Sequence, residues 1–210
     1  IQDSNKKSDI KEHLRTLLAA GHDTTSYLGC YTCYLLAKHP NIQNKLRYEI
    51  NQNIKSNYIS KDDISNLKYV NCVIKEVLRL FTIIPFITRT SIKKYSYDEG
   101  NLIIPKNSDI LIPLCIMNRN NCIWDKPSEF IPERFNDLNS NNNPNMGYLP
   151  FGYGSRTCVG NTFAILEVSI IITQIVKQFN ISVSDNFKPK IISGISLISS
   201  NGIELRLEKI

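Results

Sequence analysis

"FGYGSRTCVG" spans residues 151–160 and sets one cysteine, Cys158, between Gly154 and Gly160, at the start of a helical pattern. A glycine-rich turn that leads into a helix can serve a phosphate, a catalytic nucleophile or a metal ion. Unpaired N–H groups at a helix start favour a thiolate over a thiol, which suits a metal ligand. A buried cysteine with a packing role is the plain alternative for this residue taken alone.

The spacing of the stretch excludes the phosphate and nucleophile chemistries. A P-loop has the pattern G-x-x-x-x-G-K-[ST], but five residues separate Gly154 from Gly160, and Asn161 follows. A dinucleotide-binding motif that starts at Gly152 requires a glycine where Thr157 stands. A nucleophilic cysteine needs a nearby base, and none of the three histidines completes a convincing pair with Cys158 (His13, His22, His39). A metal ligand and a buried cysteine therefore remain.

The composition is that of a globular protein. The chain has 210 residues, 42% of them hydrophobic, and a formal net charge of +6. Its lysines and arginines are interspersed with acids, so we expect a solvated surface and no binding of nucleic acid. No apolar run is long enough to span a bilayer, and no signal-peptide pattern opens the sequence. The only C-x-x-C, Cys30 and Cys33, lies in an apolar helical run, which predicts core packing rather than a zinc or redox site.

Helical periodicity dominates both ends of the chain. Ser60 with Asp63 three residues later forms a variant of the capping box, and predicts a helix start there. Apolar residues at helical spacing predict longer helices over residues 9–38, 41–53, 67–81 and 158–178.

Shorter β-branched runs separate these helices and end the chain. Residues 86–114 contain three such runs divided by turn residues, which predict a small antiparallel sheet. Residues 118–150 have little periodicity, and the asparagine-rich segment 136–147 is expected to be a dispensable surface loop. Asn201-Gly202 between two alternating runs predicts a terminal β-hairpin. The sequence therefore predicts a mainly α fold with small antiparallel β-sheets.

The pattern F-x-x-G-x-R-x-C-x-G over residues 151–160 resembles the haem-binding loop of the cytochrome P-450 haem-thiolate monooxygenases. The resemblance continues through Phe163-Ala164 and Glu167. It implies haem b as the cofactor and Cys158 as the thiolate axial ligand of its iron. The resemblance assigns four more loop residues to the cofactor. Phe151 forms an apolar wall, Gly154 and Gly160 leave room for the flat group, and Arg156 pairs with a propionate.

A second segment carries the resemblance on the oxygen side of the haem. "AAGHDTTS" at 19–26 is similar to the family's distal helix segment. There Ala20 and Gly21 leave room beside the haem, and Asp23 and Thr24 are the catalytic acid and alcohol that guide protons to oxygen. A threonine hydroxyl bonded back to a carbonyl is also expected to open this helix locally.

The third signature joins Glu76-x-x-Arg79 to "PERF" at 132–135, which supplies Arg134. The resemblance implies that these three charges form a buried structural network. It also pairs Arg89, together with Arg156, with the haem propionates. Asn118 stands where many relatives carry histidine, which leaves one propionate contact open.

The resemblance implies that residues 1–210 are the C-terminal portion of a single P-450 domain whose N-terminal half is absent. The intact parent is then a monooxygenase that inserts one oxygen atom of O2 into an organic, apolar substrate, with electrons from a separate reductase. The parent is expected at the cytoplasmic face of the endoplasmic reticulum membrane, which it would contact only through the missing N-terminal part. We expect this chain alone to be inactive. The alternatives are a truncated non-enzymatic remnant and a haem-thiolate isomerase or dehydratase, against which Asp23 and Thr24 argue.

Overall fold

The computed structural model describes residues 2–56, 58–136 and 147–210. These residues form a mainly α structure with small antiparallel sheets, which confirms the predicted fold class. The ten residues 137–146 of the asparagine-rich segment lie outside the described residues, so the loop expected there stays a prediction. None of the helices in the described ranges combines the length and the apolar content needed to cross a membrane.

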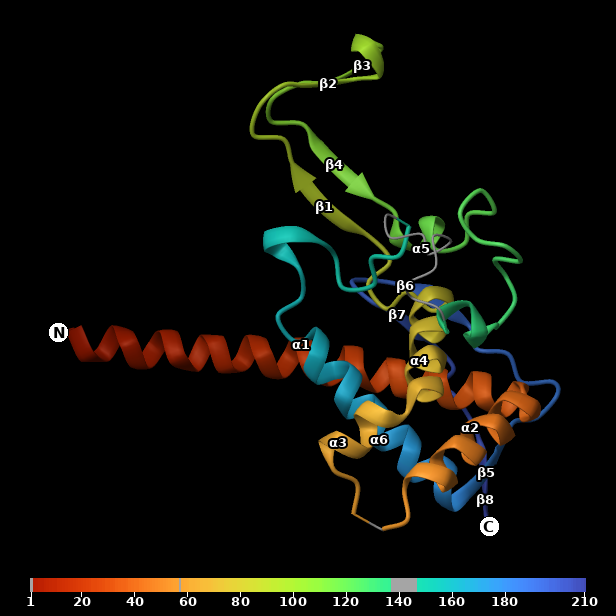
Figure 1. Cartoon of the computed structure of the whole chain (residues 1–210). Helices are drawn as coiled ribbons and strands as arrows, with labels where there is room; N and C mark the ends of the chain where they lie inside the picture. The colour runs from red at the N-terminus through yellow and green to blue at the C-terminus, as the bar shows by residue number, and fades with distance from the viewer. Residues whose placement is uncertain (1, 57, 137–146) are drawn as a thin grey trace.

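The first helix, α1, runs from Gln2 to Lys38 and begins earlier than the predicted residue 9. The additional residues are polar and lack apolar periodicity, which is why the sequence pattern missed them. In Figure 1 the N-terminal part of α1 projects away from the rest of the chain. Helix α2 (Pro40–Asn53) follows at once, with Pro40 in the first turn, where its missing N–H costs nothing.

Helices α3 (Lys61–Asn66) and α4 (Lys68–Leu80) begin with different caps. In α3, Ser60 accepts a hydrogen bond from the Asp63 backbone and donates its own N–H to the Asp63 carboxylate, which confirms the predicted capping box. Helix α4 has no cap from its own segment. Instead, the Glu49 carboxylate of α2 accepts hydrogen bonds from Tyr69 N and Val70 N, at 2.7 and 3.0 Å.

The core lies where α1, α2, α4 and α6 (Asn161–Gln178) pack on one another. Gln43 of α2 connects α1 with the strand β5 (Phe179–Ser182): its Nε2 donates to the carbonyls of Leu36 and Ile181, and its Oε1 accepts from Ile181 N. Leu36, Leu46, Val73 and Ile172 have no exposed surface. Buried apolar area of this kind supplies most of the stability of a helical domain.

The middle of the chain is antiparallel, as predicted, but its strands form two separate pairs instead of one sheet. β1 (Ile87–Thr90) pairs with β4 (Asp109–Ile112), and β2 (Tyr95–Tyr97) pairs with β3 (Leu102–Ile104). In Figure 1 the β2–β3 pair lies farthest from the helices. The turn between β2 and β3 contains a 3-10 segment (Asp98–Gly100), and α5 (Leu114–Met117) follows β4. Two other 3-10 segments are Pro132–Phe135 and Gly154–Arg156.

The predicted terminal hairpin across Asn201-Gly202 is wrong. The strand before it, β7 (Leu197–Ser199), pairs with β6 (Ile191–Ser193), and the strand after it, β8 (Arg206–Lys209), pairs with β5 (Phe179–Ser182). The reason is the Asn201 side chain, whose Oδ1 accepts from Lys190 N at 2.7 Å and whose Nδ2 donates to Lys188 O. These bonds tie the turn to the segment before β6, so the chain leaves β7 rather than folding back on it.

Candidate active site

Cys158 lies in a loop that its own backbone closes. Cys158 N donates to Phe151 O at 2.9 Å, and Thr157 N donates to Gly154 O at 3.1 Å. Gly152 and Gly154 have φ values of +76° and +73°, a region that residues with a Cβ rarely adopt. The glycines therefore allow the chain to turn back tightly around the cysteine.

The structure corrects two expectations for Cys158. Helix α6 begins at Asn161 with Gly160 as its N-cap, so Cys158 precedes the helix instead of lying in its first turn. Cys158 is a free, exposed thiol, so the alternative of a buried packing cysteine is wrong. A Cβ at Gly160 would lie 3.9 Å from Cys158 Sγ, and its absence leaves the space beside the sulfur open.

The other loop residues differ in exposure. Phe151 packs against the core and is only partly exposed, whereas Arg156 is exposed. Arg89, on β1, donates to Thr88 O at 2.8 Å. Their assignment to propionates stays a prediction. Asn118 is buried instead of facing the loop, because its Nδ2 donates to Thr82 Oγ1 at 2.9 Å.

The segment at 19–26 lies on α1 in a continuous helix. Thr24 Oγ1 donates to Ala20 O at 2.7 Å, which is the predicted back-bond. The helix continues through this bond, however, so the expected local opening is not observed. Asp23 is exposed and its Oδ1 lies 2.8 Å from His22 Nδ1.

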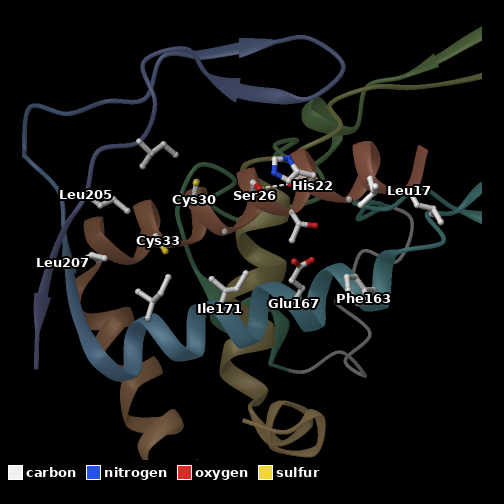
Figure 2. A pocket seen from close by; sticks show the side chains of 16 residues that line it. Leu17, His22, Ser26, Cys30, Cys33, Phe163, Glu167, Ile171, Leu205 and Leu207 are labelled. Atoms are coloured by element: carbon white, nitrogen blue, oxygen red, sulfur yellow. Dashed lines mark hydrogen bonds between the residues drawn. The ribbon is translucent and has the colours of Figure 1, made fainter. Parts of the chain in front are cut away.

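A cavity of about 750 Å³ lies between α1 and α6. Figure 2 shows Leu17, His22 and Ser26 of α1 on one side and Phe163, Glu167 and Ile171 of α6 on the other. Of the predicted site residues, Gly21 lines this cavity, whereas Ala20, Asp23, Thr24 and the cysteine loop do not. The walls are mostly apolar, and the half-buried Glu167 brings a carboxylate into them. The sequence pattern included Glu167 without giving it a role.

Glu76, Arg79 and Arg134 meet in one buried network. Arg79 Nε and Nη2 donate to the two Glu76 carboxylate oxygens at 2.7 and 2.8 Å, a bidentate arrangement. Arg134 Nε donates to Glu76 Oε1 at 3.0 Å. The side chains of Glu76 and Arg79 are fully buried, and that of Arg134 is 12% exposed. The structure thus brings these three residues together.

Three carbonyl groups and one aromatic ring complete the network, and sequence reasoning missed them. Arg79 donates to the carbonyls of Asn118, Pro127 and Glu129. The indole ring of Trp124 lies 5.1 Å from the Arg79 guanidinium and 5.8 Å from that of Arg134. The chain has one tryptophan, and its position eight residues before "PERF" is the feature of the sequence that could have pointed to it. Arg79 and its partners therefore fix the irregular segment before the cysteine loop against α4.

The donor set at Cys158 fits a haem. Within the described ranges, no group of three or more His, Cys, Asp or Glu side chains is arranged to hold a metal ion. A haem brings ligands of its own for the iron, so a single cysteine side chain is enough for the protein to hold it. The exposed thiol and the open space left by Gly160 leave a flat group access to the sulfur.

Comparisons with known proteins identify the family of the chain. The family model described as cytochrome P-450 matches residues 2–205. The chain is 31% identical over 206 residues to cytochrome P-450 4V2 of Mus musculus, covering 97% of this chain and 39% of that protein. It is 34% identical over 215 residues to cytokinin hydroxylase of Arabidopsis thaliana, covering 98% of this chain and 41% of that protein. It is 33% identical over 197 residues to cytochrome P-450 6a2 of Drosophila melanogaster, covering 91% and 39%.

The chain thus spans about two fifths of the length of these curated relatives. The family model, in contrast, matches nearly the whole of this chain. On these grounds the chain belongs to the cytochrome P-450 family.

Proposed function

We propose that the protein containing this chain is a haem-thiolate monooxygenase, with Cys158 as the axial ligand of haem b. The observation that carries the proposal is the exposed, free Cys158 in a glycine-turned loop directly before α6. When bound, the haem supplies the reductive activation of O2, from which one oxygen atom enters the substrate and the other leaves as water.

The loop holds the cofactor on the cysteine side. Cys158 provides a thiolate, whose electron donation favours cleavage of the O–O bond. Gly154 and Gly160 leave room for the flat ring, and Phe151 provides an apolar wall. Arg89 and Arg156 are proposed to pair with the propionates by charge-assisted hydrogen bonds.

Helix α1 acts on the oxygen side. Ala20 and Gly21 are exposed and small, which keeps this face of the helix open for dioxygen and substrate. Asp23 and Thr24 are the acid and alcohol proposed to hand protons to oxygen. The Thr24 hydroxyl donates to Ala20 O, so in this position it is oriented by its own helix while its oxygen lone pairs stay available.

The substrate is proposed to be an organic, apolar molecule. The cavity between α1 and α6 supports this, since Leu17, Phe163 and Ile171 dominate the walls that Figure 2 shows. Electrons are proposed to come from a separate reductase, and the parent is proposed to work at the endoplasmic reticulum membrane.

The absorption spectrum of the reduced, carbon-monoxide-bound full-length protein tests the axial ligand. We expect the thiolate signature in the parent and its loss in Cys158→Ser. Cys122→Ser is the matched control, because Cys122 is also a free, exposed cysteine, and we expect it to keep the signature. An unchanged spectrum in Cys158→Ser would show that Cys158 is not the ligand.

A further inference from the structure

A second recess lies between α3, α4 and α6 and shares no lining residue with the cavity between α1 and α6. Its volume is about 470 Å³. One face of α4 forms a wall, because Lys68, Asn71, Cys72 and Lys75 recur at the spacing that places residues on one side of a helix. The start of α6 forms the opposite wall with Thr162.

Three lysines line this recess, and among the described residues no acidic side chain does (Lys61, Lys68, Lys75). None of the three forms a salt bridge with a described residue. Lys75 is half-buried, and this burial lowers its pKa. An anion between these ammonium groups would offset the loss of hydration that burial imposes on Lys75.

The floor of the recess is apolar. Leu67 and Phe135 are almost fully buried, at 1% and 2% exposure, and Ile64, Ile165 and Leu166 are partly buried around them. An inorganic anion alone would leave the exposed parts of Ile64, Ile165 and Leu166 uncovered. The lining therefore matches a molecule with a charged group at one end and an apolar group at the other.

We propose that this recess, the lysine-rimmed recess, binds a phosphate monoester that carries an apolar group. A phosphate monoester has a charge of about −1.5 to −2 at neutral pH and three acceptor oxygens, which suits three lysines better than a single carboxylate does. The volume lies within the range of about 300–1,000 Å³ that is typical of small-molecule sites. The proposal stands apart from the haem assignment, since it involves none of the residues assigned there.

Calorimetric titration of the full-length protein tests the recess with octyl phosphate, inorganic phosphate, octanoate and octanol as probes. We expect octyl phosphate to bind at least about tenfold more tightly than each of the other three. In Lys68→Gln/Lys75→Gln we expect the affinity for octyl phosphate to fall by about tenfold or more. Lys93→Gln/Lys94→Gln is the matched control, because it removes the same charge from two exposed lysines outside the recess.

Sedimentation with phosphatidylcholine vesicles, with and without phosphatidate, separates two sources of the phosphate monoester. Phosphatidate-dependent sedimentation that octyl phosphate competes away supports a lipid headgroup, and binding of octyl phosphate without sedimentation supports a soluble ligand. Equal affinity for octanol and octyl phosphate, or equal affinity in the Lys68/Lys75 variant and the parent with unchanged circular dichroism, would overturn the proposal. So would absence of octyl phosphate binding together with weaker reductase binding in that variant, which would assign the recess to an acidic protein.

Discussion

Glu76 and Arg79 have no exposed side-chain surface, whereas the neighbours of Cys158 in the cysteine loop are open to solvent, with Tyr153 75% and Val159 88% exposed. The polar side-chain atoms of Glu76 and Arg79 all find partners within the described residues, and Glu76 accepts from Arg79, Arg134 and Ile131 N. The neighbouring Trp124 Nε1 is the exception, because it is buried without a hydrogen-bond partner among those residues. The thiol of the loop is free. Glu76 and Arg79 are therefore satisfied by partners within the chain, whereas the groups of the cysteine loop are open to solvent.

Helix α1 repeats this difference along its length. Leu35 and Leu36 are 7% and 0% exposed, whereas Leu17 and Leu18 are 57% and 71% exposed. The same apolar spacing thus gives a core face at one end of the helix and an open face at the end that carries the proposed catalytic segment. We therefore expect mutations in the buried network to lower the free energy of unfolding, and mutations in the cysteine loop to change ligand binding.

Glu76→Ala should have the largest effect. It strands two guanidinium groups, one of them fully buried, and removing one partner of a buried ion pair costs about 3–5 kcal/mol. We expect that loss in the free energy of unfolding, measured by urea titration, together with loss of haem incorporation. Glu12→Ala removes an exposed pair with Arg15 and should change stability by at most about 1 kcal/mol. Normal stability and haem content in Glu76→Ala would refute the role given to the network.

Arg79→Lys should come next. Lysine keeps the charge but cannot reproduce the bidentate contact with Glu76 or reach all three carbonyls that Arg79 serves. We expect a loss of about 2–3 kcal/mol in urea titration, because buried carbonyls are left unpaired. The exposed Arg15→Lys is the control and should be neutral. If Arg79→Lys and Arg15→Lys unfold at the same urea concentration, the geometry of the Arg79 guanidinium does not contribute to stability.

Local signals were sufficient for much of the fold. The period of α4 and the Ser60–Asp63 cap depend on residues a few positions apart, and both predictions are confirmed. The hairpin prediction at Asn201-Gly202 failed because the course of the chain depends on hydrogen bonds between Asn201 and both Lys188 and Lys190, more than ten residues earlier in the chain. Local turn chemistry does not contain such a contact.

In the candidate site, too, some features depend on adjacent residues and others depend on contacts between distant segments. The spacing of the glycines and Cys158 depends on a few adjacent residues and left a metal ligand or a buried cysteine as alternatives. The haem-binding role came from the family resemblance and stays a prediction. The exposure of Cys158 and the acceptors of Arg79 depend on how segments up to fifty residues apart pack, as the bond from Arg79 to Glu129 shows. Trp124 escaped notice for that reason, since only the folded chain places its ring beside two guanidinium groups.

The cap of α3 is intermediate between the buried network and the cysteine loop, because its polar groups have partners within the chain but remain accessible to solvent. Hydrogen bonds from the Ser60 backbone and side chain lower the pKa of Asp63 below its ordinary value of 3.8. Because the pKa of Asp63 is lower in the folded state, its ionised carboxylate stabilises the folded state at pH values above 3.8. This stabilisation is lost as the pH falls through the folded pKa. We expect Ser60→Ala to cost about 1 kcal/mol at neutral pH in urea titration, and Asp63→Asn to differ less from the parent at pH 3 than at pH 7. A constant difference across this range would exclude the Asp63 carboxylate as the titrating group.

Cys158→Ser should have the smallest effect on stability, although it removes the proposed iron ligand. The thiol is exposed and free, and substitutions at such positions usually change the free energy of unfolding by less than about 0.5 kcal/mol. The measurement must use haem-free protein, because a bound cofactor would add its own binding energy to the folded state. Cys33→Ser is the contrast, since Cys33 is buried in the core and a hydroxyl there costs about 1–3 kcal/mol unless it finds a partner. A large loss in haem-free Cys158→Ser would mean that the loop is part of the packed structure, and the division between a self-sufficient network and an open ligand loop would fail.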